Sequence, residues 1–126
     1  CFEYGDQGGT FSGTPLIAAA GVAVIQVLLS DGFLHAASQA GAQLAEGLSA
    51  ISSEFSMGEV RGRGFLLALE LGNNTGPEIV SLAREYGLLL NAPRSHCLRF
   101  MPALNSTPAE IDEGLSLLKR VLREVK

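Results

Sequence analysis

The segment 15–29, PLIAAAGVAVIQVLL, carries no charged residue and constrains the fold more than any other feature of this chain. Thr14 and Pro15 are typical of the N-cap and the first position of a helix. A helix that is apolar nearly all round has to be buried on most sides, and this one is shorter than the roughly 20 residues that span a bilayer. A chain of 126 residues has difficulty covering such a helix alone, so we expect a dimer or a higher oligomer.

The composition fits one ordinary globular domain. Hydrophobic residues make up 47% and charged residues 17%, which provides for a core and argues against disorder. The net charge of −4 and the scattered basic residues argue against a nucleic-acid partner. Cys1 and Cys97 form neither a disulfide framework nor a metal site, and they favour a reducing compartment. No secretory signal is visible, so we expect a cytoplasmic protein without a membrane partner.

The hydrophobic pattern predicts several helices. Apolar residues spaced by three and four predict a helix from Phe33 to Phe55. Two segments match a capping box that opens a helix, Thr75 to Glu78 and Thr107 to Glu110. The first of these helices is expected to end at Gly87.

The segments between these helices predict a small sheet. The continuous apolar run from Phe65 to Leu69 is typical of a strand that is covered on both faces. We expect strands at 59–62, 65–71, 88–91 and 97–101, with a turn at 92–95. This order of elements predicts an α/β or α+β sandwich, in which helices cover the sheet.

A glycine-rich loop, residues 5–15 (GDQGGTFSGTP), precedes the apolar helix. Its glycines allow the backbone to approach a ligand closely, Thr10 and Ser12 supply hydroxyls, and free N–H groups can bind an anion. The loop lacks the Lys-Ser/Thr pair of a Walker loop and follows no predicted strand. Phosphate binding and an ordinary turn before a helix both remain open on composition alone.

Arginine appears in two unusual settings. Arg99 stands among apolar residues of a predicted strand, where a charge needs a partner, and its guanidinium can hold a carboxylate through two hydrogen bonds. The alternative is an edge arginine paired with Glu59 or Glu70. The segment Arg61 to Gly64 is typical of a bulged edge strand with solvated arginines. We expect His96 to be structural, and no spacing of a nucleophile with a base indicates a catalytic residue.

Three segments, in order, resemble motifs of the class-III, pyridoxal-phosphate-dependent aminotransferases. They are the loop 5–16, the segment 59–66, and the segment 87–94 followed by 98–104. The resemblance covers essentially the whole chain. The sequences DQGGT and LLNAPR are most similar to those of the acetylornithine aminotransferase branch, which works in arginine biosynthesis. The chain opens on Cys1 instead of Met, so we expect a fragment, the C-terminal portion of such an enzyme.

The resemblance implies an arrangement of parts. Residues 1–14 would be a loop at the cofactor phosphate and the subunit interface, residues 15–29 an apolar interdomain helix, and residues 30–126 the C-terminal small domain of a fold-type-I aminotransferase. Thr10, with Gly9 beside it, would contact the phosphate of pyridoxal 5'-phosphate in the other subunit of a homodimer. Arg99 would hold the α-carboxylate of the amino donor or of 2-oxoglutarate.

This sequence departs from the family pattern in two ways. Thr14 replaces the usual Asn before Pro15, and Gly9 replaces a frequent Ser. The family's cofactor-binding lysine, the aspartate that pairs with the pyridine nitrogen and the stacking aromatic precede this loop, so no catalytic residue is expected in this chain. The isolated chain is expected to be inactive and not to bind the cofactor covalently. A stand-alone, non-catalytic ligand-binding or interaction module is the alternative.

Overall fold

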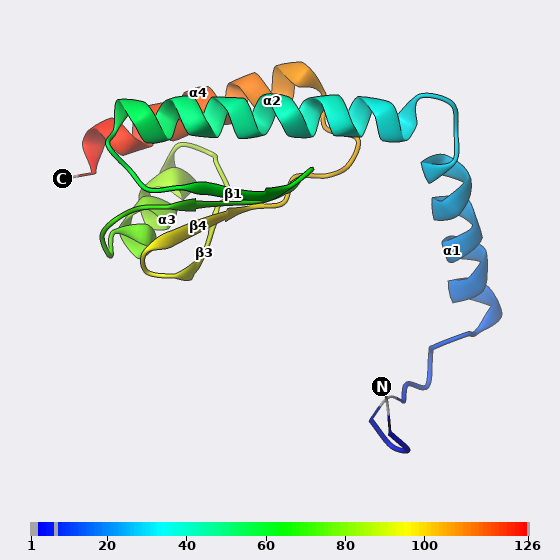
Figure 1. Cartoon of the computed structure of the whole chain (residues 1–126). Helices are drawn as coiled ribbons and strands as arrows, with labels where there is room; N and C mark the ends of the chain where they lie inside the picture. Colours follow the sequence, from blue (N-terminus) through cyan, green and yellow to red (C-terminus); the bar gives the residue numbers. More distant parts are fainter. Residues whose placement is uncertain (1–2, 7, 126) are drawn as a thin grey trace. The chain divides into compact units, whose positions relative to one another are not determined.

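The computed structural model describes residues 3–6 and 8–125, so the prediction for Cys1 lies outside the described residues. The chain divides into two compact units, residues 1–34 and 35–126, and each is considered by itself. The elements follow one another in the order α1 (Pro15–Leu28), α2 (Phe33–Glu54), β1 (Val60–Arg63), β2 (Leu66–Glu70), α3 (Gly76–Glu85), β3 (Asn91–Arg94), β4 (Cys97–Phe100) and α4 (Pro108–Glu124) (Figure 1).

The first unit consists of the glycine-rich loop and α1. The helix begins directly after Thr14, as the sequence predicts, and none of its residues is buried within this structure. Its apolar side chains are largely exposed, with Leu16 at 78%. Within the described residues no single helix is both long and apolar enough to cross a membrane, and α1 and α2 satisfy that test only as a pair interrupted by a break. The apolar surface of α1 therefore has no cover inside its own unit.

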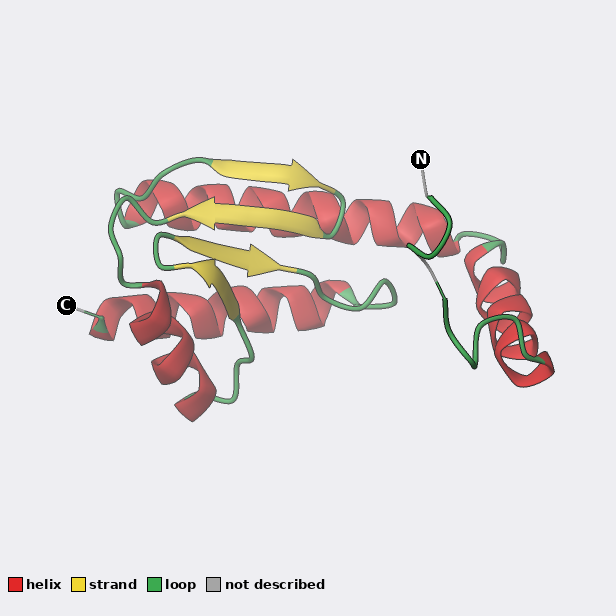
Figure 2. Cartoon of the chain, turned by 90° about the horizontal axis from the view of Figure 1, so that it is seen from below, coloured by secondary structure: helices red, strands yellow, loops and turns green. Residues whose placement is uncertain are grey.

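The second unit is built on a four-stranded antiparallel sheet with the order β1-β2-β4-β3. Helices α2 and α4 lie behind the strands in the view of Figure 2, and α3 packs against α4 and β3. The prediction of an α+β sandwich with a small helix-covered sheet is confirmed. Short hairpins join β1 to β2 and β3 to β4, which accounts for the antiparallel pairing.

One face of the sheet forms the hydrophobic core. Leu69 pairs with Leu98 and Leu67 pairs with Phe100, so these four side chains share the face that α2 and α4 cover. The helices contribute the fully buried Leu48, Ile51, Leu118 and Val121. The expectation that the run Phe65 to Leu69 is covered on both faces is wrong, because Leu66 lies on the other face and is 60% exposed. A run of three to five apolar residues does not show whether the side chains on the second face of the sheet are covered.

Polar contacts hold α4 against its neighbours. The Gln43 side chain of α2 donates to the Pro108 carbonyl and to Asp112 Oδ1, the latter over 2.7 Å. At the other end of the two helices, Glu54 pairs with Lys119 at 3.0 Å and with Arg123 at 3.3 Å. These contacts fix the helix pair that covers the sheet.

The two predicted capping boxes differ in outcome. Thr107 forms a complete box with Glu110, since its hydroxyl accepts from the Glu110 N–H while the Glu110 carboxylate accepts from the Thr107 N–H. The box at Thr75 is wrong: its hydroxyl donates to Asn73 Oδ1 over 2.6 Å, and its side chain makes no cap hydrogen bond. Asn73, two residues earlier, competes for the threonine hydroxyl. This asparagine lies outside the four-residue pattern of a capping box.

The third strand lies three residues later than predicted. β3 covers Asn91–Arg94, and the chain turns at Ser95 and His96 instead of at 92–95. Pro93 suggested a turn, but β3 is an edge strand, where a residue without an N–H costs no ladder hydrogen bond. The bulge expected in the Arg61 to Gly64 segment is also wrong, because the register of β1 with β2 is continuous, and the irregular pairing lies in β3.

Glycines let α2 approach the hairpin of β1 and β2 closely. A Cβ on Gly41 of α2 would lie 2.9 Å from the Gly64 carbonyl carbon, closer than real side chains come. Gly62 has a φ of +129°, and a Cβ there would collide with the Leu66 carbonyl oxygen. Gly64 therefore lets the hairpin pack closely on α2, and Gly62 is required by the hairpin itself.

Candidate functional site

The loop that precedes α1 forms a tight turn over residues 10–13. The Ser12 N–H donates to the Gly9 carbonyl over 3.3 Å, and the Thr14 N–H and hydroxyl both donate to the Phe11 carbonyl. Gly13 has a φ of +75°, a conformation that glycine adopts without strain. The turn thus brings the segment from Gly9 to Thr14 into a compact loop at the start of a helix.

Thr10 lies at the exposed surface of this turn. Among the residues that the structure describes, no hydrogen bond involves the Thr10 hydroxyl. A Cβ on Gly9 would lie 2.9 Å from Ser12 Oγ, so glycine keeps this side of the turn clear. The Thr10 hydroxyl can therefore donate a hydrogen bond to a phosphate group, and the glycine beside it lets that group come close to the backbone. Both residues fit a contact to the phosphate of a cofactor.

Arg99 belongs to the second unit, on the central strand β4. It pairs across the sheet with Ala68 of β2 on one side and with Asn91 of β3 on the other. Ala68 pairs in turn with Arg61 of β1, so one row runs across all four strands as Arg61, Ala68, Arg99 and Asn91. Residues that pair directly point to the same side, and this side lies opposite the core. We call it the open face.

The open face carries an excess of positive charge. The four strands contain four arginines and one carboxylate, and the pairing places all five on this face: Arg61, Arg63, Arg94, Arg99 and Glu70. Leu66 and Ala68 supply the apolar or small positions between them. A sheet face with this balance attracts anions.

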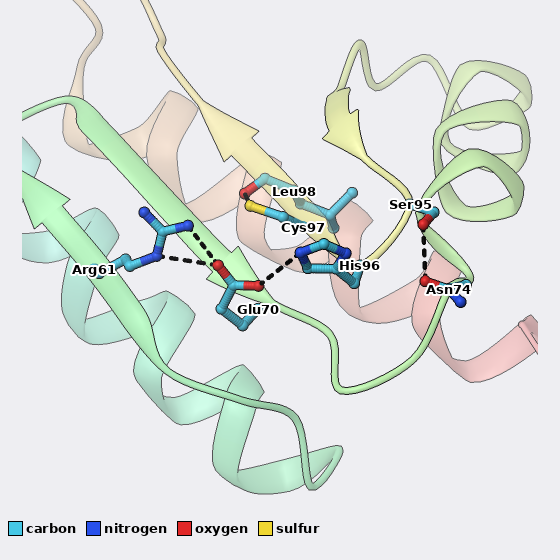
Figure 3. A network of polar contacts seen from close by, with 7 residues as sticks. All are labelled: Arg61, Glu70, Asn74, Ser95, His96, Cys97 and Leu98. Carbon is cyan, nitrogen blue, oxygen red and sulfur yellow. Dashed lines mark hydrogen bonds and ion pairs between the residues drawn. The ribbon is translucent and has the colours of Figure 1, made fainter.

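Glu70 is engaged by its neighbours on this face (Figure 3). Its Oε1 accepts hydrogen bonds from Arg61 Nε at 3.0 Å and from Arg61 Nη2 at 2.5 Å. His96 Nε2 lies 3.9 Å from the other carboxylate oxygen. The hydrogen bonds from Arg61 hold the pKa of Glu70 below its usual value, and the same pair raises the pKa of Arg61. Both charges are therefore kept in the folded protein.

Arg99 has no such partner. In the described part of the chain no carboxylate lies within ion-pair distance of its guanidinium, and the side chain is exposed. The alternative prediction, an edge arginine paired with Glu59 or Glu70, is wrong: β4 lies inside the sheet, Glu70 binds Arg61, and among the described residues Arg99 forms no ion pair with Glu59. Arg99 is therefore available to a ligand.

A cavity of about 220 Å³ adjoins Arg99 in the same unit. Its walls come from the end of β4, from the segment before β3 and from α4, and they are mostly apolar. The lining includes Leu89, Arg99, Met101, Ser106, Glu110 and Leu115. Glu110 is committed to the cap of α4, and its hydrogen bonds with Thr107 lower its pKa. A hollow with mostly apolar walls thus adjoins the strand that carries Arg99.

The predicted site residues belong to two different units of the structure. Gly9 and Thr10 lie in the first unit, and Arg99 lies in the second. Sequence reasoning missed the pairing of Arg61 with Glu70 and took both arginines of the 61–64 segment as solvated. Arg61 and Glu70 belong to two predicted strands that follow each other along the chain, which is a signal that they could form an ion pair. The sequence does not give the register between these strands, and the register makes the two residues neighbours.

Comparisons with known proteins place this chain in a family. The model of the family "Aminotransferase class-III" matches residues 1–122. Over 97% of its length the chain is 49% identical to acetylornithine aminotransferase of Ralstonia nicotianae, of which the match covers 31%. It is 48% identical to acetylornithine aminotransferase 2 of Bordetella pertussis over 99% of its length and 32% of that protein. The chain spans about a third of the length of these curated relatives.

Solved structures give the same answer at the level of the fold. The crystal structure of N-acetylornithine aminotransferase from Stenotrophomonas maltophilia superposes with a TM-score of 0.82 at 33% identity, covering 88% of this chain and 32% of the other. The acetylornithine aminotransferase from Elizabethkingia anophelis shares the fold, with a TM-score of 0.85 at 22% identity, over 98% of this chain and 34% of the other. On the match of the family model over nearly its whole length, this chain belongs to the class-III aminotransferases.

Proposed function

We propose that the chain acts as the C-terminal portion of an acetylornithine aminotransferase, which transfers the amino group of N2-acetylornithine to 2-oxoglutarate. The observation that carries the proposal is Arg99, an exposed arginine of β4 on the open face that has no carboxylate partner in the described part of the chain. Both substrates present an α-carboxylate, and the planar guanidinium can hold that group through two parallel hydrogen bonds. The names of the relatives support acetylornithine as the donor.

Class-III aminotransferases depend on pyridoxal 5'-phosphate. Thr10 and Gly9 fit its phosphate group through a hydroxyl and a close backbone approach. When bound, the cofactor supplies an electron sink for the amino-group transfer. The contribution of this chain is to bind and orient: Arg99 fixes the carboxylate end of the substrate, and the loop at Thr10 anchors the phosphate. The residues that bind the cofactor covalently and move protons are assigned to the rest of the enzyme.

We also assign the loop and α1 to a subunit interface, with Thr10 serving the cofactor of the other subunit in a homodimer. The support is the apolar surface of α1, which carries no buried residue within its unit. Large exposed apolar surfaces mark interaction sites in proteins. Sedimentation of the chain at micromolar concentration is expected to show a dimer or a higher oligomer, and a monomer would contradict this assignment. A cytoplasmic location is part of the proposal.

The activity is tested on the full-length enzyme with a panel of amino donors: N2-acetylornithine, ornithine, succinylornithine and 4-aminobutyrate. We expect the highest kcat/KM with N2-acetylornithine, and a preference for another donor would reject the named substrate. The isolated chain is expected to show no transamination. It is also expected to show no visible absorbance band of covalently bound cofactor after addition of pyridoxal 5'-phosphate, so the appearance of that band would overturn this part of the proposal.

The role of Arg99 has its own test. Arg99→Met in the full-length enzyme is expected to raise KM for 2-oxoglutarate, whose α-carboxylate adjoins the reacting carbon, roughly 10- to 100-fold, the value of a charge-assisted hydrogen-bond pair. Arg84→Met, which removes an exposed arginine that belongs to helix α3 and not to the sheet, serves as the matched control. Unchanged KM values in Arg99→Met would remove Arg99 from the substrate site.

The second candidate is a stand-alone module that binds anionic ligands without catalysis. The charge of the open face favours it, since four arginines and one carboxylate share that face. A gene that encodes the lysine-bearing domain in the same reading frame supports the aminotransferase. A reading frame that starts just before Cys1, together with tight binding of a dicarboxylate by this chain alone, supports the module.

A further inference from the structure

Arg99 has one direct neighbour on each side across the open face, and the two neighbours differ in chemistry. Ala68 of β2 pairs with Arg99 on one side and offers only a methyl group. Asn91 of β3 pairs with it on the other side and carries a carboxamide, which both donates and accepts hydrogen bonds. Residues that pair directly have their Cβ atoms about 5 Å apart, so the Asn91 carboxamide stands beside the Arg99 side chain.

An irregularity in β3 brings Asn91 to the open face. Asn91 pairs with Arg99, and three residues later Arg94 pairs with Cys97, which is only two residues from Arg99 along β4. In a regular strand, residues 91 and 94 would point to opposite faces, whereas the additional residue of a bulge places both on the open face. Ala92, next to Asn91, packs against the hydrophobic core instead. The bulge therefore has a consequence for the site, because it sets an amide beside Arg99.

The Asn91 side chain is not engaged within its own unit. It is exposed, and none of the hydrogen bonds among the described residues involves its amide. Two other asparagines contrast with it, since Asn73 accepts a hydrogen bond from Thr75 and Asn74 accepts one from Ser95. Asparagine is unfavourable in strands, so Asn91 brings the sheet no stability of its own. Its amide is available to a ligand.

A carboxylate accepts more hydrogen bonds than one arginine supplies. Each of its two oxygens has two lone pairs, and the guanidinium fork uses one on each oxygen. In 2-oxoglutarate the α-carboxylate adjoins the reacting carbon. In N2-acetylornithine the amino group that is transferred lies at the far end of the molecule from the carboxylate. A donor beside Arg99 therefore adds to the recognition of the keto acid and not to that of the amino donor.

We propose that Asn91 is a further substrate-binding residue, whose Nδ2–H donates a hydrogen bond to the carboxylate that Arg99 holds. The inference rests on the proposed function, in which Arg99 binds the α-carboxylate of 2-oxoglutarate. L-glutamate, which the reaction forms from this keto acid, keeps the same carboxylate on the reacting carbon and is bound in the same way. Asn91 thus favours 2-oxo and 2-amino acids over ligands whose reacting carbon bears no carboxylate.

The test uses the full-length enzyme with Asn91→Ala. Loss of one hydrogen bond is expected to lower kcat/KM for 2-oxoglutarate, and for L-glutamate in the reverse direction, roughly 3- to 10-fold. The change is expected in KM, with little change in kcat, because the bond holds the substrate both before and during the reaction. The value for N2-acetylornithine is expected to stay the same. An unchanged value for 2-oxoglutarate, or an equal fall for all three substrates, would overturn the inference.

Asn91→Asp separates hydrogen bonding from packing. Aspartate keeps the size of the side chain but places a negative charge beside Arg99 and the substrate carboxylate. It is expected to lower kcat/KM for 2-oxoglutarate more than Asn91→Ala does, because it repels that carboxylate and competes for the guanidinium. If Asn91 served only the packing of β3, aspartate would be the milder change, and that order of effects would overturn the inference. Should Asn91→Ala fail to fold, the variant of equal size still decides.

A double-mutant cycle shows whether Asn91 and Arg99 act on the same carboxylate. If they do, Asn91→Ala is expected to have a smaller effect on kcat/KM for 2-oxoglutarate in an Arg99→Met background than in the wild type, because the carboxylate is no longer held beside the amide. Equal factors in the two backgrounds would place Asn91 at another part of the substrate and contradict the inference.

Two further comparisons distinguish the possible failures. Asn105→Ala removes an exposed asparagine of the turn before α4 and is expected to leave all three kcat/KM values unchanged. If Arg99→Met leaves KM for 2-oxoglutarate unchanged, the proposed function itself fails at this site. If Arg99→Met raises that KM while Asn91→Ala alters no value, only the role of Asn91 is rejected.

Discussion

Helix α1 and helix α2 show how similar amounts of apolar sequence lead to different outcomes. In α2 the apolar residues recur on one side, and Leu44, Leu48 and Ile51 are buried against the sheet. In α1 the apolar residues surround the helix, and none is buried within its unit. A stripe of apolar residues can be covered by one sheet, whereas a helix that is apolar all round needs partners on several sides. The arrangement of apolar residues, more than their number, decides whether this chain covers a helix by itself.

The largest expected effect contrasts the core with α1. Leu69→Ala removes a side chain that is fully buried and is expected to lower the free energy of unfolding by about 2–5 kcal/mol, through lost burial and a residual cavity. Leu16→Ala, at a residue of α1 that is 78% exposed, is the matched control and is expected to change it by less than about 0.5 kcal/mol. Urea unfolding followed by circular dichroism measures both. Both variants are measured at a dilution at which the chain is monomeric, because the proposed subunit interface would cover Leu16; equal losses there would show that α1 is covered within its own unit.

A second contrast compares two helical glycines. Gly41→Ala is expected to destabilise the chain by about 1–3 kcal/mol, because the added methyl group meets the Gly64 backbone at 2.9 Å. Gly21→Ala in α1 meets nothing within 4 Å and is expected to raise helix stability by up to about 1 kcal/mol. Thermal unfolding of the two variants checks the signs. A neutral Gly41→Ala would contradict the close approach of α2 to the hairpin.

A third contrast concerns the helix starts in the second unit. Thr107→Ala is expected to cost about 1 kcal/mol, since Thr107 closes a complete capping box. Thr75→Ala is expected to cost less, because the Thr75 side chain caps no N–H of α3. Urea midpoints of the two variants, measured side by side, decide the order. A larger loss for Thr75→Ala would reverse the assignment of the caps.

The smallest expected effect is a loss of stability in acid. Ion pairs lower the pKa of Glu54, through Lys119 first, and of Glu70, through Arg61 first, from the ordinary value of 4.5. A carboxyl group whose pKa is lower in the folded state stabilises the protein above its unfolded pKa, and that contribution is lost as the pH falls through the folded pKa. We expect a constant urea midpoint near neutral pH and a decline below about pH 4.5.

The control for this decline removes one of the two carboxyl groups. Glu54→Gln is expected to flatten the fall of the urea midpoint in acid, because one titrating group with a lowered pKa is gone. An unaltered pH profile in this variant would show that the pair with Lys119 and Arg123 does not form in solution. High salt is expected to reduce the effect, because both partners are partly exposed.

Much of the fold was predictable because its determinants are local. The periodic apolar residues of α2, the start of α1 after Thr14 and the capping box at Thr107 all depend on residues within a few positions of one another. Most of the errors occurred where the outcome depends on distant segments, whereas the capping box at Thr75 failed because of Asn73, only two residues away. Pro93 suggests a turn until the strand is known to lie at an edge, and the run Phe65 to Leu69 does not reveal which of its faces is covered.

The same distinction holds for the candidate site. Thr10, Gly9 and Arg99 were recognisable as candidates from short motifs, and these motifs also indicated the family. The sequence alone thus determined the helices, the class of fold, the family and the three candidate residues, because each is encoded over a short stretch. Only the tertiary structure decided that Glu70 binds Arg61 and that Arg99 has no ion-pair partner among the residues the structure describes. The physical reason is strand register: it sets which side chains meet across a sheet, and it follows from the packing of the whole unit.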